Sequence, residues 1–213
     1  MAITLNAKEV SHNEGYILTV SDKATPAISA VARTRSGAIY AIETIRQLLK
    51  KTDGNYIAAV CTISDWPEFG FRSFMLDESR HFHGKEMVKR MLNEMVRLKM
   101  NTFHWHLVDD PGWRIEIKGY PKLTEEGSLS DFSHWFPGKE EWQKIYPGRE
   151  RSYYTQNEIK EIVEYAAERG IRIIPEIEVP AHCTAATRVY PELQTKRDDG
   201  KDEGYALYNV ISP

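Results

Sequence analysis

The sequence has no long apolar run, little cysteine and no excess of basic residues. None of its stretches approaches the roughly 18 consecutive apolar residues of a membrane-spanning helix. The first residues lack the basic and apolar regions of a signal peptide, so none is expected in this chain and the location in the cell stays unknown. The 28 basic and 31 acidic side chains give a net charge of −3, and no basic run favours nucleic acid. The two cysteines, Cys61 and Cys183, form no Cys-x-x-Cys motif, which argues against a disulfide framework or a zinc knuckle.

The composition is that of a globular protein. Hydrophobic residues make up 41% of the 213 residues, charged residues make up 28%, and the mean hydropathy is −0.51. This length predicts one or two domains. It is too short for a complete (β/α)₈ barrel of about 250 residues together with a second domain.

The first part of the chain predicts a small α+β region. Ser36 is a candidate N-cap for a helix with Ile39, Ile42, Ile45, Leu48 and Leu49 on its apolar face. Short strands are predicted over residues 17–20, 28–31 and 56–60. A break at Asp65-Trp66-Pro67-Glu68 then changes the pattern, and we place a domain boundary there, between residues 1–68 and 69–213.

After the break, predicted strands and helices alternate. Lys85 to Lys99 is predicted to be an amphipathic helix, Thr155 and Glu158 predict a capping box, and Gly170 predicts a helix end. The predicted strands cover residues 71–76, 101–108 and 171–174. This order indicates an α/β fold with parallel strands joined by right-handed crossovers.

Ionisable side chains stand at the end of each of these three strands. In a parallel α/β barrel, the active site forms at the carboxyl ends of the strands. Turn or capping roles explain one such cluster, but three in succession favour a site, because His106 and Glu176 lie at strand ends rather than in loops. The clusters are Asp77, Glu78 and Arg80; His106, Asp109 and Asp110; and Glu176, Glu178 and His182.

Residues 109–154 form a long segment that is rich in aromatic side chains. Loops of this length are often functional, and exposed rings stack on sugar faces. For most of these rings, the favoured interpretation is a small core within the loop itself. They are Trp113, Tyr120, Phe132, Trp135, Phe136, Trp142, Tyr146, Tyr153 and Tyr154.

Two His-x-His pairs raise a metal-dependent barrel hydrolase as an alternative. Residues i and i+2 of a strand share a face, so His81 with His83, or His104 with His106, are candidate zinc or iron ligands, with Asp109 as a third. The acidic residues complete no recognisable ligand set, however. Phe103, Trp105 and Leu107 occupy the other face of the second strand, so the histidines also fit a packed interior.

Several stretches carry more specific motifs. They are GFRSFMLDESRHF at 70–82, LKMNTFHWHLVDD at 98–110, GWRIEIKGYPKL at 112–123, and PEIEVPAH at 175–182 followed by YPEL at 190–193. These stretches resemble the first three barrel strands of glycoside hydrolase family 20, the β-N-acetylhexosaminidases. Residues 15–20 and 40–49 resemble the end of the α+β domain that precedes the barrel in this family.

The resemblance implies the first three βα units of a TIM (β/α)₈ barrel, preceded by part of a small α+β domain. It also implies removal of terminal β-linked N-acetylglucosamine or N-acetylgalactosamine from an oligosaccharide or glycoconjugate, with retention of configuration and without a cofactor. In this substrate-assisted reaction the 2-acetamido oxygen attacks the anomeric carbon and forms an oxazolinium ion. One carboxylate orients the acetamido group and a second carboxyl group protonates the leaving oxygen.

The resemblance also assigns roles to individual residues. Arg80 matches the arginine that binds hydroxyls of the terminal sugar, as a guanidinium with several fixed donors can. Asp109 and His182 match a pair behind the general acid that tunes its pKa. His106 is expected to support the site from its strand end, and Glu176 to lie behind it.

Two departures from the family pattern stand close to His182. Glu178 replaces the usual Asp, and Ala181 replaces the usual Gly. The added methylene and Cβ are expected to shift His182 slightly. Glu178, like Glu176, is expected to support the site from behind. Residues 194–208 are polar and loop-like, and we do not align them with the family pattern.

The family's catalytic Asp-Glu pair has no counterpart in this chain. It follows the fourth barrel strand, whereas Asp77-Glu78 and Asp202-Glu203 lie in other contexts. We therefore expect a truncated chain that is inactive alone. The alternative of a different class is a non-catalytic sugar-binding or interaction module that uses Arg80 and the aromatic segment.

Overall fold

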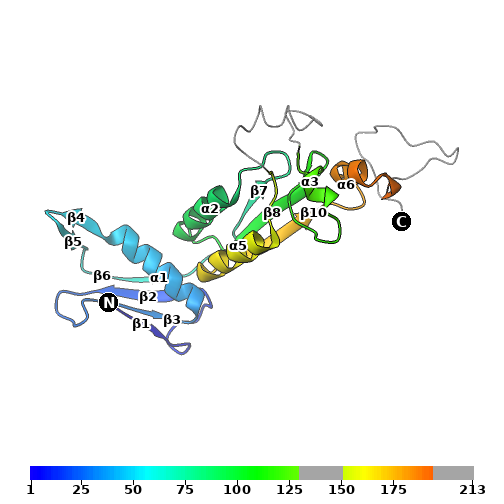
Figure 1. The fold of residues 1–213 in the computed structure, drawn as a ribbon. Helices are drawn as coiled ribbons and strands as arrows, with labels where there is room; N and C mark the ends of the chain where they lie inside the picture. Colours follow the sequence, from blue (N-terminus) through cyan, green and yellow to red (C-terminus); the bar gives the residue numbers. More distant parts are fainter. Residues whose placement is uncertain (130–150, 194–213) are drawn as a thin grey trace. The chain divides into compact units, whose positions relative to one another are not determined.

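The computed structural model describes residues 1–129 and 151–193, and the chain divides into two compact units (Figure 1). The first unit holds the N-terminal sheet, and the second holds the three strands whose ends carry the candidate site. The first unit comprises Met1–Ser73, Met91–Thr102 and Ala166–Arg172, and the second comprises Phe74–Arg90, Phe103–Tyr165 and Ile173–Pro213.

The first unit is built on a four-stranded sheet in the order β1-β3-β2-β6. β2 runs antiparallel to β3 and β6, and β1 runs parallel to β3. Helix α1 (Arg35–Leu48) lies along one face of this sheet, as Figure 1 shows. The strands are β1 (Ala2–Leu5), β2 (Tyr16–Val20), β3 (Ile28–Ala32) and β6 (Cys61–Asp65).

The core of the first unit forms between this sheet and α1. Every second residue of β2 is buried, as expected for a strand with one covered face. The buried residues of α1 that pack against this face of the sheet are spaced so that they lie on one side of the helix. The buried cluster comprises Tyr16, Leu18, Ala30, Ala32, Tyr40, Ala41 and Ile45.

Two local predictions for the first unit are wrong. Helix α1 begins at Arg35 after Thr34, so Ser36 is inside the helix rather than its N-cap. Of the strand predicted over residues 56–60, only the first residues are strand, in β5 (Asn55–Ile57), which pairs with β4 (Lys50–Thr52), and residues 58–60 lie between β5 and β6. Asp53 and Gly54 both have positive φ, 48° and 82°, which is the geometry of a tight two-residue hairpin turn. The strands predicted over 17–20 and 28–31 are confirmed as β2 and β3.

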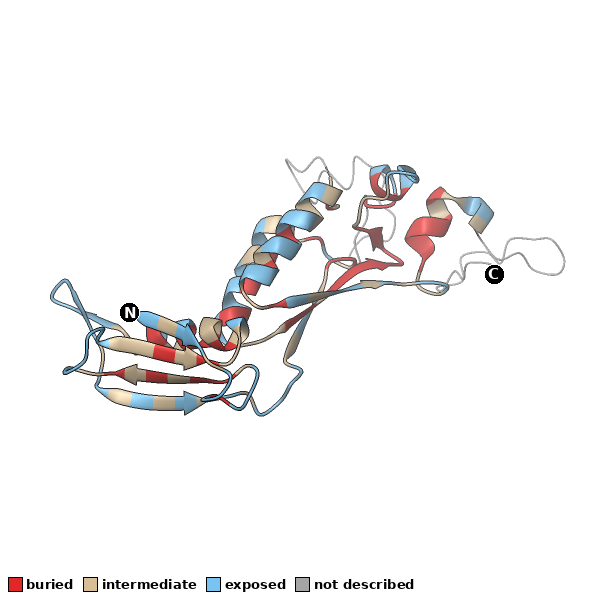
Figure 2. Ribbon diagram, turned by 90° about the horizontal axis from the view of Figure 1, so that it is seen from below, coloured by how far each residue is buried: buried red, intermediate tan, exposed pale blue. Residues whose placement is uncertain are grey.

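The second unit contains a sheet in the order β10-β8-β7, and β9 pairs with β8. The central strand β8 is buried along almost its whole length, whereas β7 and β10 are largely exposed or half-buried (Figure 2). Phe103, Trp105 and Leu107 are each at most 1% exposed, so the apolar face predicted for this strand is confirmed. The strands are β7 (Ser73–Asp77), β8 (Thr102–Asp109), β9 (Gly112–Trp113) and β10 (Arg172–Ile177).

Helices stand between and after these strands, in the predicted alternation. The predicted capping box is confirmed, because the Glu158 carboxylate accepts a hydrogen bond from the Thr155 backbone N–H at 2.9 Å. Gly170 has φ 69° after the end of its helix, as its predicted role requires. The helices are α2 (Lys85–Arg97), α3 (Lys122–Glu125), α5 (Gln156–Glu168) and α6 (Thr184–Val189), followed by the 3₁₀ turn η1 (Pro191–Leu193).

Within residues 1–129 and 151–193, no helix combines the length and the apolar character needed to cross a membrane.

Candidate functional site

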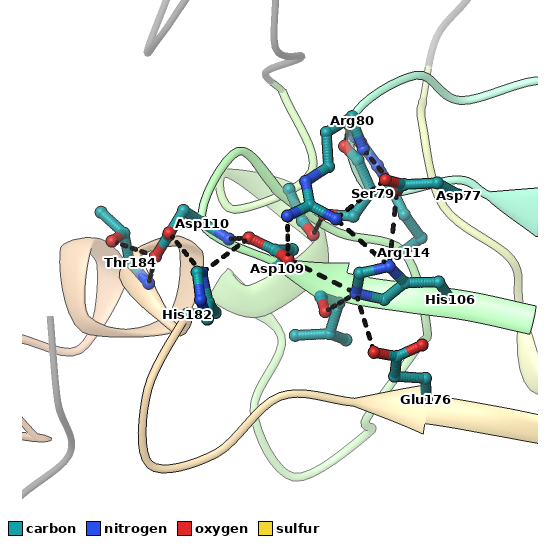
Figure 3. Close-up of polar contacts among 12 residues, drawn as sticks. Asp77, Ser79, Arg80, His106, Asp109, Asp110, Arg114, Glu176, His182 and Thr184 are labelled. Carbon is teal, nitrogen blue, oxygen red and sulfur yellow. Dashed lines mark hydrogen bonds and ion pairs between the residues drawn. The ribbon is translucent and has the colours of Figure 1, made fainter. Parts of the chain in front are cut away.

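The carboxyl ends of β7, β8 and β10 meet at one edge of the sheet of the second unit. Arg80, in the turn after β7, contacts Asp109 at the end of β8, and Glu176 near the end of β10 lies close to His106 of β8. Figure 3 shows these side chains together with His182, which follows β10. The structure therefore brings together the residues that the sequence placed at three separate strand ends.

Arg80 is the cation at the centre of this group. Its Nη1 lies 2.8 Å from Asp77 Oδ2, and its Nη2 lies 2.6 Å from Asp109 Oδ2. The Arg80 backbone N–H also donates to Asp77 Oδ1 at 3.0 Å, which fixes the turn locally. The Arg80 side chain remains 36% exposed, so the guanidinium is held by two carboxylates and is still reachable from solvent.

His106 is buried beside Arg80, and its two ring nitrogens have different partners. Nε2 lies 3.0 Å from the Val108 carbonyl oxygen, which only accepts, so Nε2 carries a proton. Nδ1 lies 3.3 Å from Arg80 Nη1, which only donates, so Nδ1 is the acceptor. These contacts place the ring proton on Nε2. Nδ1 of His106 then accepts a hydrogen bond that helps to hold the Arg80 guanidinium in place.

Asp109 is almost completely buried, with a 3% exposed side chain. Burial raises the pKa of Asp109 above its ordinary value, although the backbone N–H of Asp110 and the charge of Arg80 both act in the opposite direction. That backbone N–H donates to Asp109 Oδ1 at 2.6 Å. A buried carboxyl group beside a partly exposed guanidinium is typical of a functional site.

Among the described residues, the carboxylate nearest to His182 is Asp110, which the sequence analysis placed in the second strand-end cluster but gave no role. His182 Nδ1 lies 3.0 Å from Asp110 Oδ2 and 3.5 Å from Asp109 Oδ1. The other oxygen of Asp110 accepts hydrogen bonds from the Thr184 backbone N–H at 3.1 Å and the Thr184 hydroxyl at 2.6 Å. His182 has φ 53°, an uncommon conformation for a residue other than glycine. Its contact with Asp110 holds the imidazole toward the strand ends.

Glu176 of β10 and Glu178, which follows the strand, lie beside His106. Glu176 Oε2 lies 2.6 Å from His104 Nε2, and Glu176 Oε1 lies 3.8 Å from His106 Nε2. The Glu176 carboxyl group, through a hydrogen bond, raises the pKa of Glu178 above its ordinary value, and burial adds to this effect. The two glutamates thus lie beside the site, at the predicted strand end.

Ring nitrogens of the predicted metal-ligand pair His104 and His106 already have protein partners. His104 bonds to Glu176, while both nitrogens of His106 are engaged by Val108 and Arg80. His81 and His83 lie beyond the end of β7, not within a strand as the motif requires. Two groups in the described residues have ligand atoms within 4.8 Å of one another, namely His106, Glu176 and Glu178, and Asp109, Asp110 and His182. Arg80 places a positive charge against a member of each group, which disfavours a bound cation.

The aromatic segment lies only partly within the described residues. Tyr154 is 1% exposed and packs against Phe82 and Trp105, with ring centroids 5.0 and 4.8 Å apart. Trp113 is 8% exposed, whereas Tyr120 is 57% exposed and contacts Tyr190. Tyr154 therefore packs against rings outside residues 109–154 rather than within the predicted loop core, and Trp113 is buried. Of the other predicted rings, Tyr153 is half-buried beside the Arg151 guanidinium, whereas Phe132, Trp135, Phe136, Trp142 and Tyr146 lie outside the described residues, as do residues 194–208.

Glu78 and Arg114 form a fully buried layer behind the strand ends. Each is 0% exposed. Burial raises the pKa of Glu78 to about 7, against hydrogen bonds such as the one from the His83 backbone N–H at 2.9 Å. The sequence placed Asp77 and Glu78 together in the first cluster, and Asp77 is the one that pairs with Arg80. Arg114 was missed, although it lies within the GWR motif at 112–114.

Comparison with known families identifies both parts of the chain. The family model for the glycosyl hydrolase family 20 catalytic domain matches residues 69–210. The model for domain 2 of the same family matches residues 1–66.

Individual relatives agree with this match. A β-hexosaminidase of Vibrio furnissii is 39% identical over 214 aligned residues, which cover 99% of this chain and 34% of the relative. A β-hexosaminidase of Porphyromonas gingivalis is 42% identical over 84% of this chain and 22% of the relative. The crystal structure of a family 20 exo-β-N-acetylglucosaminidase from Vibrio harveyi in complex with N-acetylglucosamine matches with a TM-score of 0.77 and 36% identity, over 100% of this chain and 33% of that one. This chain thus spans about a third or less of the length of these relatives.

Proposed function

This chain belongs to glycosyl hydrolase family 20, and we propose that it supplies the terminal-sugar side of the active site of a β-N-acetylhexosaminidase. The proposed enzyme removes terminal β-linked N-acetylglucosamine or N-acetylgalactosamine, with retention of configuration. The observation that carries the proposal is the partly exposed Arg80 guanidinium, held by Asp77 and Asp109 where strand ends meet.

Arg80 is suited to bind sugar hydroxyl groups. Its contacts with Asp77, His106 and Asp109 engage Nη1 twice and Nη2 once. Among the described residues, this pattern leaves the second Nη2 proton and the Nε proton for a ligand. Two neighbouring hydroxyl groups of a sugar ring fit such a fork of donors, and the fixed geometry favours one orientation of the ring.

We assign His182 to the support of the general acid. Asp110 accepts the Nδ1 proton of His182, so Nε2 is the basic nitrogen of the ring. Asp109 lies 3.5 Å from the same Nδ1 and adds negative charge behind the imidazole. A carboxyl group placed against Nε2 exchanges its proton with a base whose orientation is fixed, which is what general acid–base catalysis requires.

The proposed reaction uses the substrate's own acetamido group as the nucleophile. The carbonyl oxygen of that group attacks the anomeric carbon as the glycosidic C–O bond breaks, and the general acid gives its proton to the leaving oxygen. Water then opens the oxazolinium ion and returns a proton to the same group. The resemblance assigns the general acid and the acetamido-orienting carboxylate to an Asp-Glu pair after a fourth barrel strand. The residues of this chain bind and orient the sugar.

The same proposal extends to domain organisation. Residues 1–68 are assigned to the C-terminal part of the family's N-terminal α+β domain, and residues 69–213 to the first three βα units of a TIM barrel. Support comes from the family matches, which meet between residues 66 and 69. The alternation of β7, α2, β8, α5, β10 and α6, with charged side chains at the strand ends, also supports it.

The test compares two chromogenic substrates with the full-length protein. An aryl N-acetyl-β-glucosaminide is expected to be cleaved, and the matching aryl β-glucoside, which lacks the acetamido nucleophile, is expected to be resistant. Equal cleavage of both would contradict the substrate-assisted reaction. The 213-residue chain alone is expected to show no turnover above a His182→Ala control.

The alternative functions give different results in the same assay. A sugar-binding module would bind N-acetylglucosamine without turnover by the full-length protein. A metal-dependent hydrolase would lose activity on treatment with a chelator and regain it with zinc, whereas the proposed enzyme keeps its activity.

A further inference from the structure

Arg114 contacts the backbone of the turn that carries Arg80. Its Nε donates to the Glu78 carbonyl oxygen at 3.0 Å, and its Nη2 donates to the Ser79 carbonyl oxygen at 2.7 Å. These are the two residues that directly precede Arg80. Figure 3 shows the Arg114 side chain behind this turn, on the side away from His182.

The other end of the Arg114 fork is anchored to different segments. Nη1 donates to the Ser128 carbonyl oxygen, and to the Ser152 carbonyl oxygen at 3.3 Å. One planar side chain thus joins the turn after β7 to two segments far away in sequence. Because its donors are fixed in one plane, Arg114 transmits the position of these segments to the turn.

Among the described residues, Arg114 provides the hydrogen-bond donors to the two buried carbonyl groups of the turn. Glu78 and Ser79 are both 0% exposed, so water does not reach them, and a buried carbonyl oxygen without a donor costs free energy. The Glu78 backbone N–H donates to the His106 carbonyl oxygen at 3.0 Å, and the Ser79 hydroxyl donates to the Gly112 carbonyl oxygen at 2.8 Å. Arg114 supplies the donors that the two carbonyl oxygens need.

Gly112 makes room for this arrangement. A Cβ built on Gly112 would lie 2.4 Å from both Cζ and Nη2 of Arg114, far closer than atoms approach in folded proteins. Any larger residue would push the guanidinium away from the turn. Gly112 and Arg114, which stand two positions apart in the sequence, therefore work as one unit.

We propose that Arg114, seated against Gly112, is a positioning residue that sets the place of the Arg80 guanidinium through the backbone of Glu78 and Ser79. The proposal rests on the proposed function, since Arg80 is the group that meets the sugar. Arg114 itself is buried and meets no substrate.

The kinetic test is a double-mutant cycle in the full-length protein. Arg114→Lys keeps the charge but loses the planar fork, and KM for an aryl N-acetyl-β-glucosaminide is expected to rise about tenfold. In an Arg80→Ala background, the same substitution is expected to change KM by less than about twofold, because the group it positions is gone. A merely structural role would give the same factor in both backgrounds, and that result would overturn the proposal.

Two further variants keep the test decisive. Arg151→Lys is the matched control, since Arg151 pairs with Glu158 away from the strand ends, and its KM is expected to stay unchanged. Ser79→Ala removes one bond that holds the turn and is expected to raise KM about threefold, again only when Arg80 is present. An unchanged KM in folded Ser79→Ala protein would overturn the proposal even where Arg114→Lys does not fold.

Crystal structures of the same variants separate this proposal from the proposed function. The Arg80 Nη2 to Asp109 Oδ2 contact, 2.6 Å in the present structure, is expected to be lost in Arg114→Lys and kept in Arg151→Lys. If the full-length protein neither binds nor cleaves N-acetylhexosaminides, the proposed function fails. The Arg80–Asp109 contact then decides by itself whether Arg114 positions Arg80. A contact that is unchanged in Arg114→Lys would refute the positioning role.

Discussion

Buried carboxyl groups at the strand ends of the second unit respond to their surroundings differently from two ion-paired carboxyl groups of the first unit. In the first unit, burial alone would raise the pKa values of Glu14 and Asp65, but hydrogen bonds from Arg72 and Tyr40 to Glu14, and from Lys99 and Tyr16 to Asp65, hold both below their ordinary values. At the strand ends of the second unit, burial prevails, and the pKa values of Glu78 and Asp109 lie above their ordinary values.

This difference distinguishes charged side chains that stabilise the fold from charged side chains that we assign to a site. Glu14 is satisfied by donors on three sides, since Tyr40 and Asn101 also donate to the carboxylate that pairs with Arg72. Asp109 is more deeply buried, and its cation Arg80 still reaches solvent. Raised carboxyl pKa values beside an accessible cation are the pattern of a functional site.

The largest expected effect follows from removing the cation of the second unit. Arg80→Ala removes the donors that we propose bind the sugar and leaves Asp109 buried without its cationic partner, so kcat/KM for the aryl N-acetyl-β-glucosaminide is expected to fall about 1,000-fold, or about 4 kcal/mol. Steady-state kinetics of the full-length protein measures this.

Arg72→Ala is the matched control in the first unit. It removes the cation from Glu14 and is expected to lower the free energy of unfolding by about 2 kcal/mol while KM stays unchanged. A comparable loss of kcat/KM in both variants would remove the distinction between the two units.

The next effect concerns the pH dependence of stability. The pKa of Glu78 rises from 4.5 to about 7 on folding, so the folded state binds more protons than the unfolded state between these values. Stability is therefore expected to decrease as pH rises from about 4.5 to about 7, by on the order of 3 kcal/mol from this group. Glu78→Gln is expected to remove this decrease, as measured by denaturant unfolding at several pH values.

Glu14→Gln gives the opposite sign and serves as the comparison. The pKa of Glu14 is lowered in the folded state, so its contribution is complete above the ordinary pKa of 4.5 and is lost as pH falls through the folded value. The variant should therefore lose stability near neutral pH and approach the parent protein in acid. The same sign of pH dependence for both glutamates would contradict the comparison.

A smaller effect is expected from the partner of His182. Asp110→Asn replaces an acceptor of the Nδ1 proton by a group that can also donate, and kcat is expected to fall about thirtyfold, or about 2 kcal/mol, with KM little changed. The pH profile of kcat should also shift, because the basicity of the imidazole depends on this bond. A larger shift of the pH profile in Asp109→Asn than in Asp110→Asn would show that Asp109, not Asp110, is the main partner of His182.

The smallest effect belongs to an exposed ion pair. Arg97 and Glu94 are joined at 2.7 Å on the surface of α2, with side chains 57% and 61% exposed. Arg97→Ala is expected to change the free energy of unfolding by less than about 0.5 kcal/mol. A larger change in the free energy of unfolding, measured by thermal unfolding, would mean that exposed ion pairs stabilise this fold more than expected.

Local sequence signals predicted the elements whose cause is local. The Thr155 and Glu158 capping box and the Gly170 helix end were found because each depends on residues a few positions apart. Strand β1 (Ala2–Leu5) was not predicted, because its pairing with β3 depends on residues far away in sequence. Strand β6 (Cys61–Asp65) was not predicted either, because its pairing with β2 joins residues far apart in sequence.

The site was predicted as a set of strand ends, and the one pairing predicted for its assigned residues was that of Asp109 with His182. Arg80, His106, Asp109, Glu176 and His182 were all selected from the sequence. Which of two adjacent aspartates faces His182 depends on where β8 ends and how the chain turns after β10, and neither is encoded locally. Arg114 gave no sequence signal of its own, because its acceptors are backbone carbonyl groups, which any residue provides.

The most direct test of the central claim is a crystal structure of the full-length protein with bound N-acetylglucosamine. The account predicts that the sugar lies at the carboxyl ends of β7, β8 and β10, with hydroxyl oxygens within hydrogen-bond distance of the Arg80 guanidinium and with Arg80 still in contact with Asp109. A sugar bound elsewhere in a protein that cleaves N-acetyl-β-glucosaminides, with Arg80 touching only Asp77 and Asp109, would contradict it.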